Sequence, residues 1–486
     1  MSILVIDVGT TSIRAGLVTP EGEVRHLQQK RLTSSIPAPG MLELDAEALA
    51  RDAVELAISV LQRAGSVAAV GITNQRSTTV VWDRATGKLV APAIGWQDLR
   101  TVFRCVELAG MGYHVPPNAS ATKIEAIMDS VDPERTRDLC FGTVDSWMAL
   151  KLSGGAVHVT DPSNAAMTAL LRDDGTSWNE ELLSVLRIPE RCLPQVVDTS
   201  GVAGIASILP GHPPVTAMVG DQQASMAGQG CTLAGSAKIT FGTGAMLDCC
   251  TGDMHPQFSY MGPVGGTIPI IAWQRNAALT WGVEALMLAA GASVTWLVDD
   301  LSIIDSPEES ASVAASCADT EDVYFVPALM GLGTPVWDFG ARGAFFGITG
   351  GTTRAQLVRA VLEGIAHRGV DLIDAAERDT GLTIPTVRVD GGMSTNEIFV
   401  QMLADLSGRP VEVSRVTEAT TLGAGLLAGM AVGIWRDTGD LAKLYRPAKV
   451  VEPRYSDDER TLRRSRFLAA RDRACRTVPE LSDLHF

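Results

Sequence analysis

The hydrophobic pattern at the start of the chain predicts a β-meander. Residues 3–8 and 13–18 are short runs rich in apolar and β-branched side chains, and the turn 7–12 between them carries glycine and small hydroxyl residues. A second turn at Glu21-Gly22 leads into a third strand. Short apolar runs bounded by such turns are typical of antiparallel strands.

A helix and a buried strand follow the meander. Apolar residues recur at helical spacing over 45–64, and Asp45 is placed to cap the N-terminus of this helix. The apolar run Val67 to Ile72 then predicts a strand, with the polar residues Thr73 to Arg76 at its carboxyl end. Because ligands gather beyond the carboxyl ends of strands in α/β sheets, this end is a candidate binding edge.

The second half of the chain repeats this opening. Ala237 to Phe241 predicts a strand, Gly242-Thr243-Gly244 a tight turn, and Ala245 to Cys250 the returning strand. The similarity lies in the order of elements rather than in the residues, and it suggests a duplication. We therefore expect two α/β domains, each presenting a Gly/Thr hairpin, with a ligand-binding cleft between them.

Other signals extend the α/β pattern. They are a capping box at Thr353-x-x-Gln356, a strand over 387–393 ending in a glycine pair, a cap at Ser394-x-x-Glu397 for a helix ending at Gly408, and a charged surface helix over about 456–476. The apolar stretches Ala285 to Leu297 and Gly423 to Trp435 predict buried helices, and both are too short to span a bilayer.

Composition excludes several classes of protein. The chain has 486 residues, 46% of them hydrophobic, and a formal net charge of −16. This acidity argues against a nucleic-acid or anionic-membrane partner, because both require a basic surface. The first residues lack a basic region, so no signal peptide is expected. Eight scattered cysteines without metal-binding spacing are typical of reduced thiols in a cytoplasmic protein.

The first hairpin carries the strongest local signal for chemistry. The hydroxyl and backbone N–H groups of its turn residues can surround a phosphate, an arginine can meet phosphate oxygens, and a carboxylate at the strand end can hold magnesium. These residues are Thr10, Thr11, Ser12, Arg14 and, for the metal, Asp7. An ordinary hairpin also explains the glycine and threonines and is the more common case, so the turn alone leaves both interpretations open.

Two further glycine turns strengthen the phosphate interpretation. Gly391-Gly392 precedes a helix, and Gly242-Thr243-Gly244 joins two strands. Each signal is weak alone, because such turns are common for packing reasons. Together with the first hairpin they fit a nucleotide spread across two domains, and the absence of GxxxxGK[ST] means that it would be held without a P-loop.

A candidate general base follows the strand Val215 to Val219. Asp221 at this strand end could accept the proton of a substrate hydroxyl, and the amides of Gln222 and Gln223 could fix neighbouring hydroxyls. Arg76 ends a strand in the same way. The ordinary alternatives are a helix N-cap for Asp221, which is slightly favoured without context, and a surface ion pair for Arg76.

Taken together, these residues resemble the FGGY carbohydrate kinases, and most closely their glycerol kinase branch. The resemblance covers nearly the whole chain in the correct order. Its motifs are Asp7-x-Gly-Thr-Thr-Ser-x-Arg14, Ile72-Thr-Asn-Gln-Arg76, Trp96-Gln-Asp-x-Arg-Thr101, Gly142-Thr-Val-Asp-Ser-Trp147, His158-Val-Thr-Asp161, Gly220-Asp-Gln-Gln223, Phe241-Gly-Thr-Gly244, Gly343 to Glu363, Val389-Asp-Gly-Gly392 and Gly429 to Trp435.

The resemblance implies an α/β fold of two ribonuclease-H-like domains, as in actin and hexokinase, divided here at 1–246 and 247–486 and closing on ATP and Mg²⁺. It implies Asp221 as catalytic base and Asp7 beside the metal. Nucleotide contacts would come from Thr10, Thr11, Ser12, Arg14, Thr243, Gly291, Thr295, Gly392 and Asn396, and acceptor contacts from Arg76, Ser77, Asn118, Asp221, Gln222 and Met246. A homodimer or homotetramer is compatible with it.

Departures from the glycerol kinase pattern concern the acceptor. Ser77 stands where the branch has Glu, Asn118 where it has Tyr, and Met246 where it has an aromatic residue; Thr295 replaces a Gln near the adenine. Losing hydrogen-bond partners and an apolar wall should weaken glycerol binding. The expected acceptor is a polyol or sugar longer than glycerol.

Three alternatives stay open at this point. The chain could be a true glycerol kinase whose lost contacts are replaced, or a pentulose kinase of the same family. From a different class, it could be an actin- or chaperone-like ATPase that binds proteins, although the Asp-Gln-Gln segment then has no role.

Overall fold

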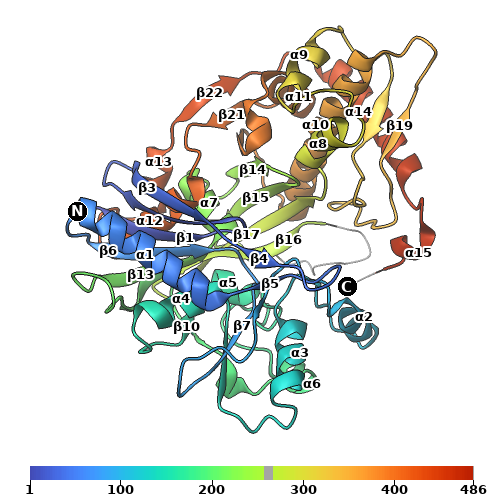
Figure 1. The fold of residues 1–486 in the computed structure, drawn as a ribbon. Helices are drawn as coiled ribbons and strands as arrows, with labels where there is room; N and C mark the ends of the chain where they lie inside the picture. Colours follow the sequence, from blue (N-terminus) through green and yellow to red (C-terminus); the bar gives the residue numbers. More distant parts are fainter. Residues whose placement is uncertain (257–265, 485–486) are drawn as a thin grey trace.

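The polypeptide folds into two lobes, each built on its own mixed β-sheet (Figure 1). This computed structural model describes residues 1–256 and 266–484. The first sheet is drawn in blue and green and the second sheet in green to red, while α12 (Ala419–Ala431), from late in the chain, lies against the first sheet. The α/β class predicted from the hydrophobic pattern is confirmed.

The first sheet has six strands in the order β12-β13-β6-β1-β2-β3. Their bounds are β1 Ile3–Val8, β2 Ser12–Val18, β3 Val24–Arg31, β6 Ala69–Asn74, β12 Ser200–Ile205 and β13 Pro214–Gly220. The predicted meander is confirmed, because β1, β2 and β3 pair antiparallel. Strands β6 and β13 then add in parallel, and β12 closes the sheet antiparallel.

The second sheet has seven strands in the order β16-β17-β15-β14-β20-β21-β22. Their bounds are β14 Ala237–Phe241, β15 Ala245–Gly252, β16 Ile268–Arg275, β17 Ala278–Met287, β20 Val387–Asp390, β21 Val411–Ser414 and β22 Pro447–Val451. Strands β17, β15 and β14 form an antiparallel meander, β20 and β21 add in parallel, and β22 is antiparallel.

The two sheets therefore share one plan. Each has three antiparallel strands, then two parallel strands, then one antiparallel strand, and the second sheet adds β16 at its edge. The architectural duplication expected from the two Gly/Thr hairpins is thus present in the strand order. The expected division at residue 246 falls inside β15, and the division into domains stays a prediction.

Helices cover both sheets. The longer ones of the first half are α1 Ala46–Ala64, α2 Val102–Gly110, α3 Ala121–Val131, α4 Val144–Leu152 and α7 Asp221–Gly228. Those of the second half are α8 Gly291–Asp299, α9 Glu309–Ala315, α10 Arg354–Thr380, α11 Glu397–Ser407, α12 Ala419–Ala431 and α14 Asp457–Ala474. The expected caps of α1 and α10 are present: the Ala48 N–H donates to Asp45 Oδ1 at 3.0 Å, and Thr353 with Gln356 forms the capping box.

Two helices rich in small residues join the lobes. Helix α12 packs on β1, β6 and β13 of the first sheet and against α7. Their backbones approach so closely that a Cβ atom on Gly228 would lie 1.9 Å from the carbonyl oxygen of Ala419. A Cβ on Gly423 would lie 1.7 Å from the carbonyl oxygen of Ala224. Only glycine permits this contact, because any side chain would overlap a rigid backbone.

Two predicted elements were wrong in detail. The stretch from Ala285 to Leu297 is not one helix, because Ala285–Met287 ends β17 in register with Leu247–Ala245 of β15, and α8 begins only at Gly291. Strand pairing overrides the helical appearance of small apolar residues. The helix after the glycine pair is capped by Asn396 rather than by Ser394, because residues 392–395 form a 3₁₀ turn.

The structure also shows the state of the cysteines and whether any described helix could span a membrane. All eight cysteines are free, and six of them are buried. Within residues 1–256 and 266–484, no helix has the length and apolar character needed to cross a bilayer.

Candidate active site

Three parallel strands of the first sheet end at the same edge and bring the predicted polar residues together. In the register, Asp7 of β1 lies beside Thr73 of β6, and Asn74 at the end of β6 lies beside Gly220 at the end of β13. Arg76 lies two residues after the end of β6, and Asp221 directly follows β13. The carboxyl edge of the sheet therefore gathers residues that are far apart in the sequence, as expected for a binding edge in an α/β sheet.

Asp221 has the environment of a general base. It is the first residue of α7; its Oδ1 accepts the Gln222 backbone N–H at 2.9 Å and lies 3.6 Å from Arg76 Nε. Its Oδ2 makes no hydrogen bond with the described residues, and 26% of the side chain is exposed. Burial raises the pKa of Asp221, and the charge of Arg76 opposes this only in part. A carboxylate of raised basicity with one oxygen free can accept a proton from a ligand hydroxyl.

Arg76 joins the two lobes at this point. Its Nη2 donates to Glu284 Oε2 of β17 at 2.7 Å, and its Nη1 lies 3.5 Å from Gln223 Oε1. The alkyl part of Arg76 passes over Gly220, where a Cβ atom would lie 2.8 Å from two of its carbons. Burial raises the pKa of Glu284 to about 7, although the charge of Arg76 lowers it. The guanidinium is thus held between one carboxylate of each lobe.

Asp7 is buried and carries an oxygen that is not engaged. Its Oδ2 accepts from Arg14 Nη1 at 3.4 Å and from Thr421 Oγ1 at 3.0 Å, while Oδ1 makes no hydrogen bond with the described residues. Burial raises the pKa of Asp7 to about 6, against the opposing effects of Arg14 and Thr421. A hard carboxylate oxygen without a hydrogen-bond partner among the described residues, with the charge of Asp221 near enough to act on it, fits a divalent cation.

The glycine turns of the second lobe converge on one place. The Gly291 N–H at the start of α8 donates to the Gly242 carbonyl at 2.9 Å, and a Cβ on Gly391 would lie 2.4 Å from the Phe241 carbonyl oxygen. Gly391 also has φ of 85°, which suits glycine. The predicted turns at 242–244 and 391–392 and the predicted contact residue Gly291 are therefore neighbours.

The remaining predicted nucleotide residues are spread around these turns. Thr10 accepts a hydrogen bond from Trp96 Nε1 at 3.3 Å, and the Gly9 N–H closes the first turn on the Ser12 carbonyl at 3.0 Å. Thr11 and Thr295 are exposed, and Thr243 lies in the turn between β14 and β15. The Asn396 side chain caps α11 and donates to Ser310 Oγ at 3.1 Å, so part of its capacity is already used within the protein.

The predicted acceptor residues differ in how free they are. The Ser77 hydroxyl donates to the Met167 carbonyl at 3.0 Å and is buried, with φ of 62°. Asn118 and Met246 are half-buried, and the Asn118 carbonyl accepts from Lys123 at 3.2 Å. Gln222 is also half-buried, and its Oε1 accepts from Lys238 Nζ at 2.8 Å.

Sequence reasoning missed three buried charged residues beside this cluster. Glu284, Lys238 and Asp248 lie inside strands of the second sheet, and Lys238 Nζ is 2.7 Å from Asp248 Oδ2. The alternation Lys-Ile-Thr-Phe in β14 was the available signal, because it places two polar residues on one face of a strand that is otherwise core. Only the contacts of Glu284 with Arg76 and of Lys238 with Gln222 show that this face meets the first lobe.

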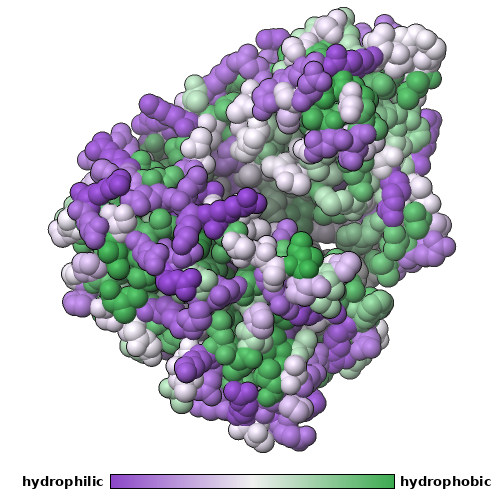
Figure 2. All heavy atoms as spheres, in the orientation of Figure 1, coloured by the Kyte–Doolittle hydropathy of each residue, from purple (hydrophilic) through white to green (hydrophobic). Residues whose placement is uncertain are grey.

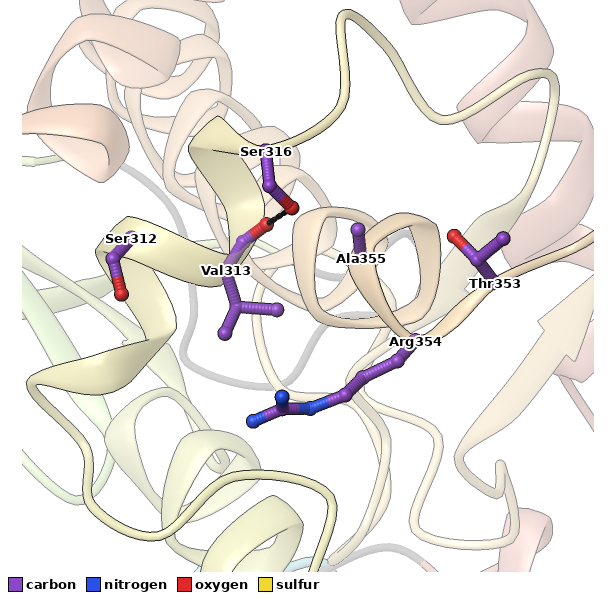
Figure 3. A pocket seen from close by; sticks show the side chains of 6 residues that line it. All are labelled: Ser312, Val313, Ser316, Thr353, Arg354 and Ala355. Atoms are coloured by element: carbon purple, nitrogen blue, oxygen red, sulfur yellow. Dashed lines mark hydrogen bonds between the residues drawn. The ribbon is translucent and has the colours of Figure 1, made fainter.

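Two surface cavities lie away from this cluster. One of about 310 Å³ opens between α9 and the start of α10 and is lined by Ser312, Val313, Ser316, Thr353, Arg354 and Ala355 (Figure 3). A neighbouring cavity of about 500 Å³ shares Arg354. The polar groups of the first are already engaged: Ser316 donates to the Val313 carbonyl, and Arg354 to Glu309. Neither cavity contains a predicted site residue, whereas the surface is visibly hollowed between the lobes (Figure 2).

Comparison with known proteins identifies the family of this chain. Models of the FGGY family of carbohydrate kinases match residues 2–228 (N-terminal domain) and 237–432 (C-terminal domain). Among curated proteins, the glycerol kinase of Dechloromonas aromatica is 43% identical over 479 residues, covering 94% of each chain. That of Thermus thermophilus is 39% identical over 483 residues, covering 95% of this chain and 96% of the relative.

Solved structures share the fold. The Plasmodium falciparum glycerol kinase with ADP superposes with a TM-score of 0.90 at 29% identity, covering 97% of this chain and 98% of that one. A xylulose kinase from Lactobacillus acidophilus has a TM-score of 0.86 at 20% identity, covering 99% and 100%, which speaks to the fold alone. The two-domain ribonuclease-H-like fold of actin and hexokinase type is confirmed. The chain therefore belongs to the FGGY family of carbohydrate kinases and is an ATP-dependent kinase.

Proposed function

We propose that the protein transfers the γ-phosphoryl group of ATP to a hydroxyl of a small polyol or sugar, with Asp221 as general base. The observation that carries this proposal is the free Oδ2 of Asp221 at the carboxyl edge of the first sheet, beside Arg76. Phosphoryl transfer depends on alignment and charge compensation more than on covalent chemistry. A base at one strand end and glycine turns on the facing lobe meet this need.

In the proposed mechanism, the acceptor lies beside Asp221, Arg76 and Gln222. The Asp221 carboxylate takes the proton of the reacting hydroxyl as its oxygen attacks the γ-phosphorus, and the bond from that phosphorus to the bridging oxygen breaks, so that ADP leaves with the electron pair. The Arg76 guanidinium keeps the carboxylate oriented. Closure of the lobes over the acceptor removes water, which would otherwise compete as a phosphoryl acceptor.

The nucleotide would be held by residues of both lobes. Thr10, Thr11, Ser12 and Arg14 would contact phosphate oxygens from the first lobe, and Thr243, Gly291, Thr295, Gly392 and Asn396 would contact the nucleotide from the second. A magnesium ion beside Asp7 would neutralise phosphate charge when bound. The net charge of −16 makes such local donors necessary, because the protein as a whole repels a polyanion.

The acceptor proposed here is longer than glycerol, with four or five carbons. In support, the Ser77 hydroxyl donates its hydrogen bond to the Met167 carbonyl, so its O–H group is not available to bind the substrate. Asn118 and Met246 are half-buried, and each carries a smaller or unbranched side chain where the glycerol kinase branch has an aromatic residue, which favours a larger acceptor. The competing assignment is glycerol kinase, which the names of the curated relatives favour.

An acceptor panel separates these assignments. ADP release would be measured by a coupled assay with glycerol, erythritol, xylitol, ribitol, D-xylulose and D-ribulose, and with no acceptor. We expect kcat/KM to be higher for at least one tetritol, pentitol or ketopentose than for glycerol. A preference for glycerol over all of them would reject the longer acceptor while leaving the kinase mechanism intact.

A further inference from the structure

One face of the second sheet carries charged residues where a core face would be expected. In the strand register, Lys238 of β14 pairs with Arg388 of β20 and with Asp248 of β15, and Asp248 pairs with Glu284 of β17. Side chains of paired residues point to the same face of a sheet. These four residues, here called the polar row, thus cross four neighbouring strands side by side, while Ile239, Leu247 and Val389 face the core of the lobe.

The polar row contacts the first lobe at three points around α7. Glu284 binds Arg76 at 2.7 Å, Lys238 Nζ donates to Gln222 Oε1 at 2.8 Å, and Arg388 Nη1 donates to the Gln229 carbonyl at 2.8 Å. Arg76 lies beside Asp221, Gln222 belongs to the first turn of α7, and Gln229 is the C-cap of this helix, so the contacts hold both ends of α7. The row therefore fixes the helix that begins with the proposed base.

Lys238 determines which way the Gln222 amide faces. Its ammonium donates to Gln222 Oε1 at 2.8 Å and to Thr240 Oγ1 at 2.9 Å, and it forms an ion pair with Asp248, whose Oδ2 lies 2.7 Å away. An ammonium group only donates, so the Gln222 atom facing it must be the oxygen. Burial acts to lower the pKa of Lys238, but the charges of Asp248 and Asp390 outweigh it, so the net shift is upward and the lysine stays charged.

The Gln222 amide nitrogen is consequently turned away from Lys238. It makes no hydrogen bond with the described residues, and Gln222 is half-buried rather than enclosed. Its two N–H groups are donors on the residue that directly follows Asp221 in α7. We propose that Lys238 is a positioning residue for substrate recognition. Because Lys238 holds the Gln222 oxygen, the Gln222 amide can only donate hydrogen bonds, and this part of the site selects a substrate oxygen that can receive them. The proposal rests on the proposed function.

The test compares acceptors that differ by one hydroxyl. The pairs are glycerol with 1,2-propanediol, erythritol with 1,2,4-butanetriol, and D-xylulose with 1-deoxy-D-xylulose. The measured quantity is the ratio of kcat/KM within a pair, which does not change if a variant is merely less folded. Loss of one well-placed hydrogen bond corresponds to about tenfold in this ratio.

Three variants separate positioning from charge pairing. The double variant Lys238→Met, Asp248→Leu removes both charges of the ion pair together, so neither is left buried without its partner. It should reduce the kcat/KM ratio about tenfold for the substrate pair that the wild-type protein discriminates best. Asp248→Asn keeps the lysine on Gln222 and should retain the wild-type ratio. Gln222→Glu presents an acceptor instead of donors and should lower kcat/KM most for the ketose D-xylulose, whose carbonyl cannot donate.

The outcomes are distinct. A folded double variant with the wild-type ratio, or an Asp248→Asn variant that loses discrimination as fully as the double variant, would overturn the role of Lys238. If the double variant does not fold, an unchanged acceptor preference in Gln222→Glu overturns it instead. Failure of the proposed function itself is visible separately, as a wild-type protein that releases no ADP in response to any acceptor.

Discussion

Replacement of Gly423 by alanine tests how the two lobes are joined. A Cβ atom at this position would lie 1.7 Å from the Ala224 carbonyl oxygen and 2.7 Å from the Gly228 nitrogen. An ordinary van der Waals contact begins at 3.4 Å, so α12 would have to move away from α7 by about 1.7 Å. Overpacking typically costs about 1–3 kcal/mol, and a clash with backbone belongs at the upper end of that range.

The expected result is a strongly lowered melting temperature. A loss of about 3 kcal/mol in a domain of this size corresponds to about 6–12 °C. Activity should fall as well, because α12 carries Thr421, whose hydroxyl donates to Asp7 at 3.0 Å. The matched control is Gly110→Ala at the end of α2, where a Cβ would meet nothing within 4 Å. It should be neutral or stabilising by up to about 1 kcal/mol.

Thermal unfolding followed by circular dichroism measures both variants under the same conditions. Melting temperatures are compared directly, since a two-lobed protein need not unfold in one step. A Gly423→Ala protein that melts within 1 °C of wild type would refute the close approach of α7 and α12.

Three further predictions concern the site. Arg76→Lys keeps the positive charge, but a lysine ammonium cannot contact Asp221, Glu284 and Gln223 together. The value of kcat/KM in the coupled assay should therefore fall at least tenfold, and an unchanged value would contradict the bridging role. The acid limb of the kcat/KM profile should lie above the ordinary carboxyl pKa of 3.8, because burial raises the pKa of Asp221 and the base must be deprotonated; a profile flat down to pH 4.5 would contradict this. For Asp7, whose pKa rises from 3.8 to about 6, the folded state favours the protonated form, so its contribution to stability is lost as pH rises through 6. Asp7→Asn should therefore raise the free energy of unfolding at pH 7.5 in EDTA by up to about 3 kcal/mol, which is observed as a higher melting temperature. The variant should also lose the further increase in melting temperature caused by Mg²⁺-ADP; a lower melting temperature in EDTA would contradict the reasoning.

Local signals in the sequence were sufficient wherever the structure depends on neighbouring residues. The hairpin at 7–12, the Asp45 cap and the Thr353–Gln356 capping box were all predicted, because each depends on a few adjacent residues. The predicted cap at Ser394 was wrong, because residues 392–395 form a 3₁₀ turn and the cap lies at Asn396. Gly391, just before this turn, packs closely on the Phe241 backbone, a contact between distant residues that local sequence does not reveal.

The charged residues that the second sheet adds to the site could not be predicted, because their placement arises from register across that sheet. Arg76 and Glu284 are 208 positions apart in the sequence. Glu284 lies near the end of β17, directly before the apolar stretch from Ala285 that was predicted to be a helix. Lys238 and Asp248 become partners only when β14 and β15 pair in the observed register. The composition of each segment carries no information about which face of the sheet meets the other lobe.

The most direct test of the central claim is acceptor-dependent ADP release by Asp221→Asn. This variant keeps the size of the side chain but removes the base, and a general base contributes about 10²–10⁴ in rate. We predict a loss of turnover in that range with the best acceptor of the panel, while the thermal shift caused by Mg²⁺-ADP stays at its wild-type value. Turnover within tenfold of wild type would contradict Asp221 as the base and, with it, the proposed site.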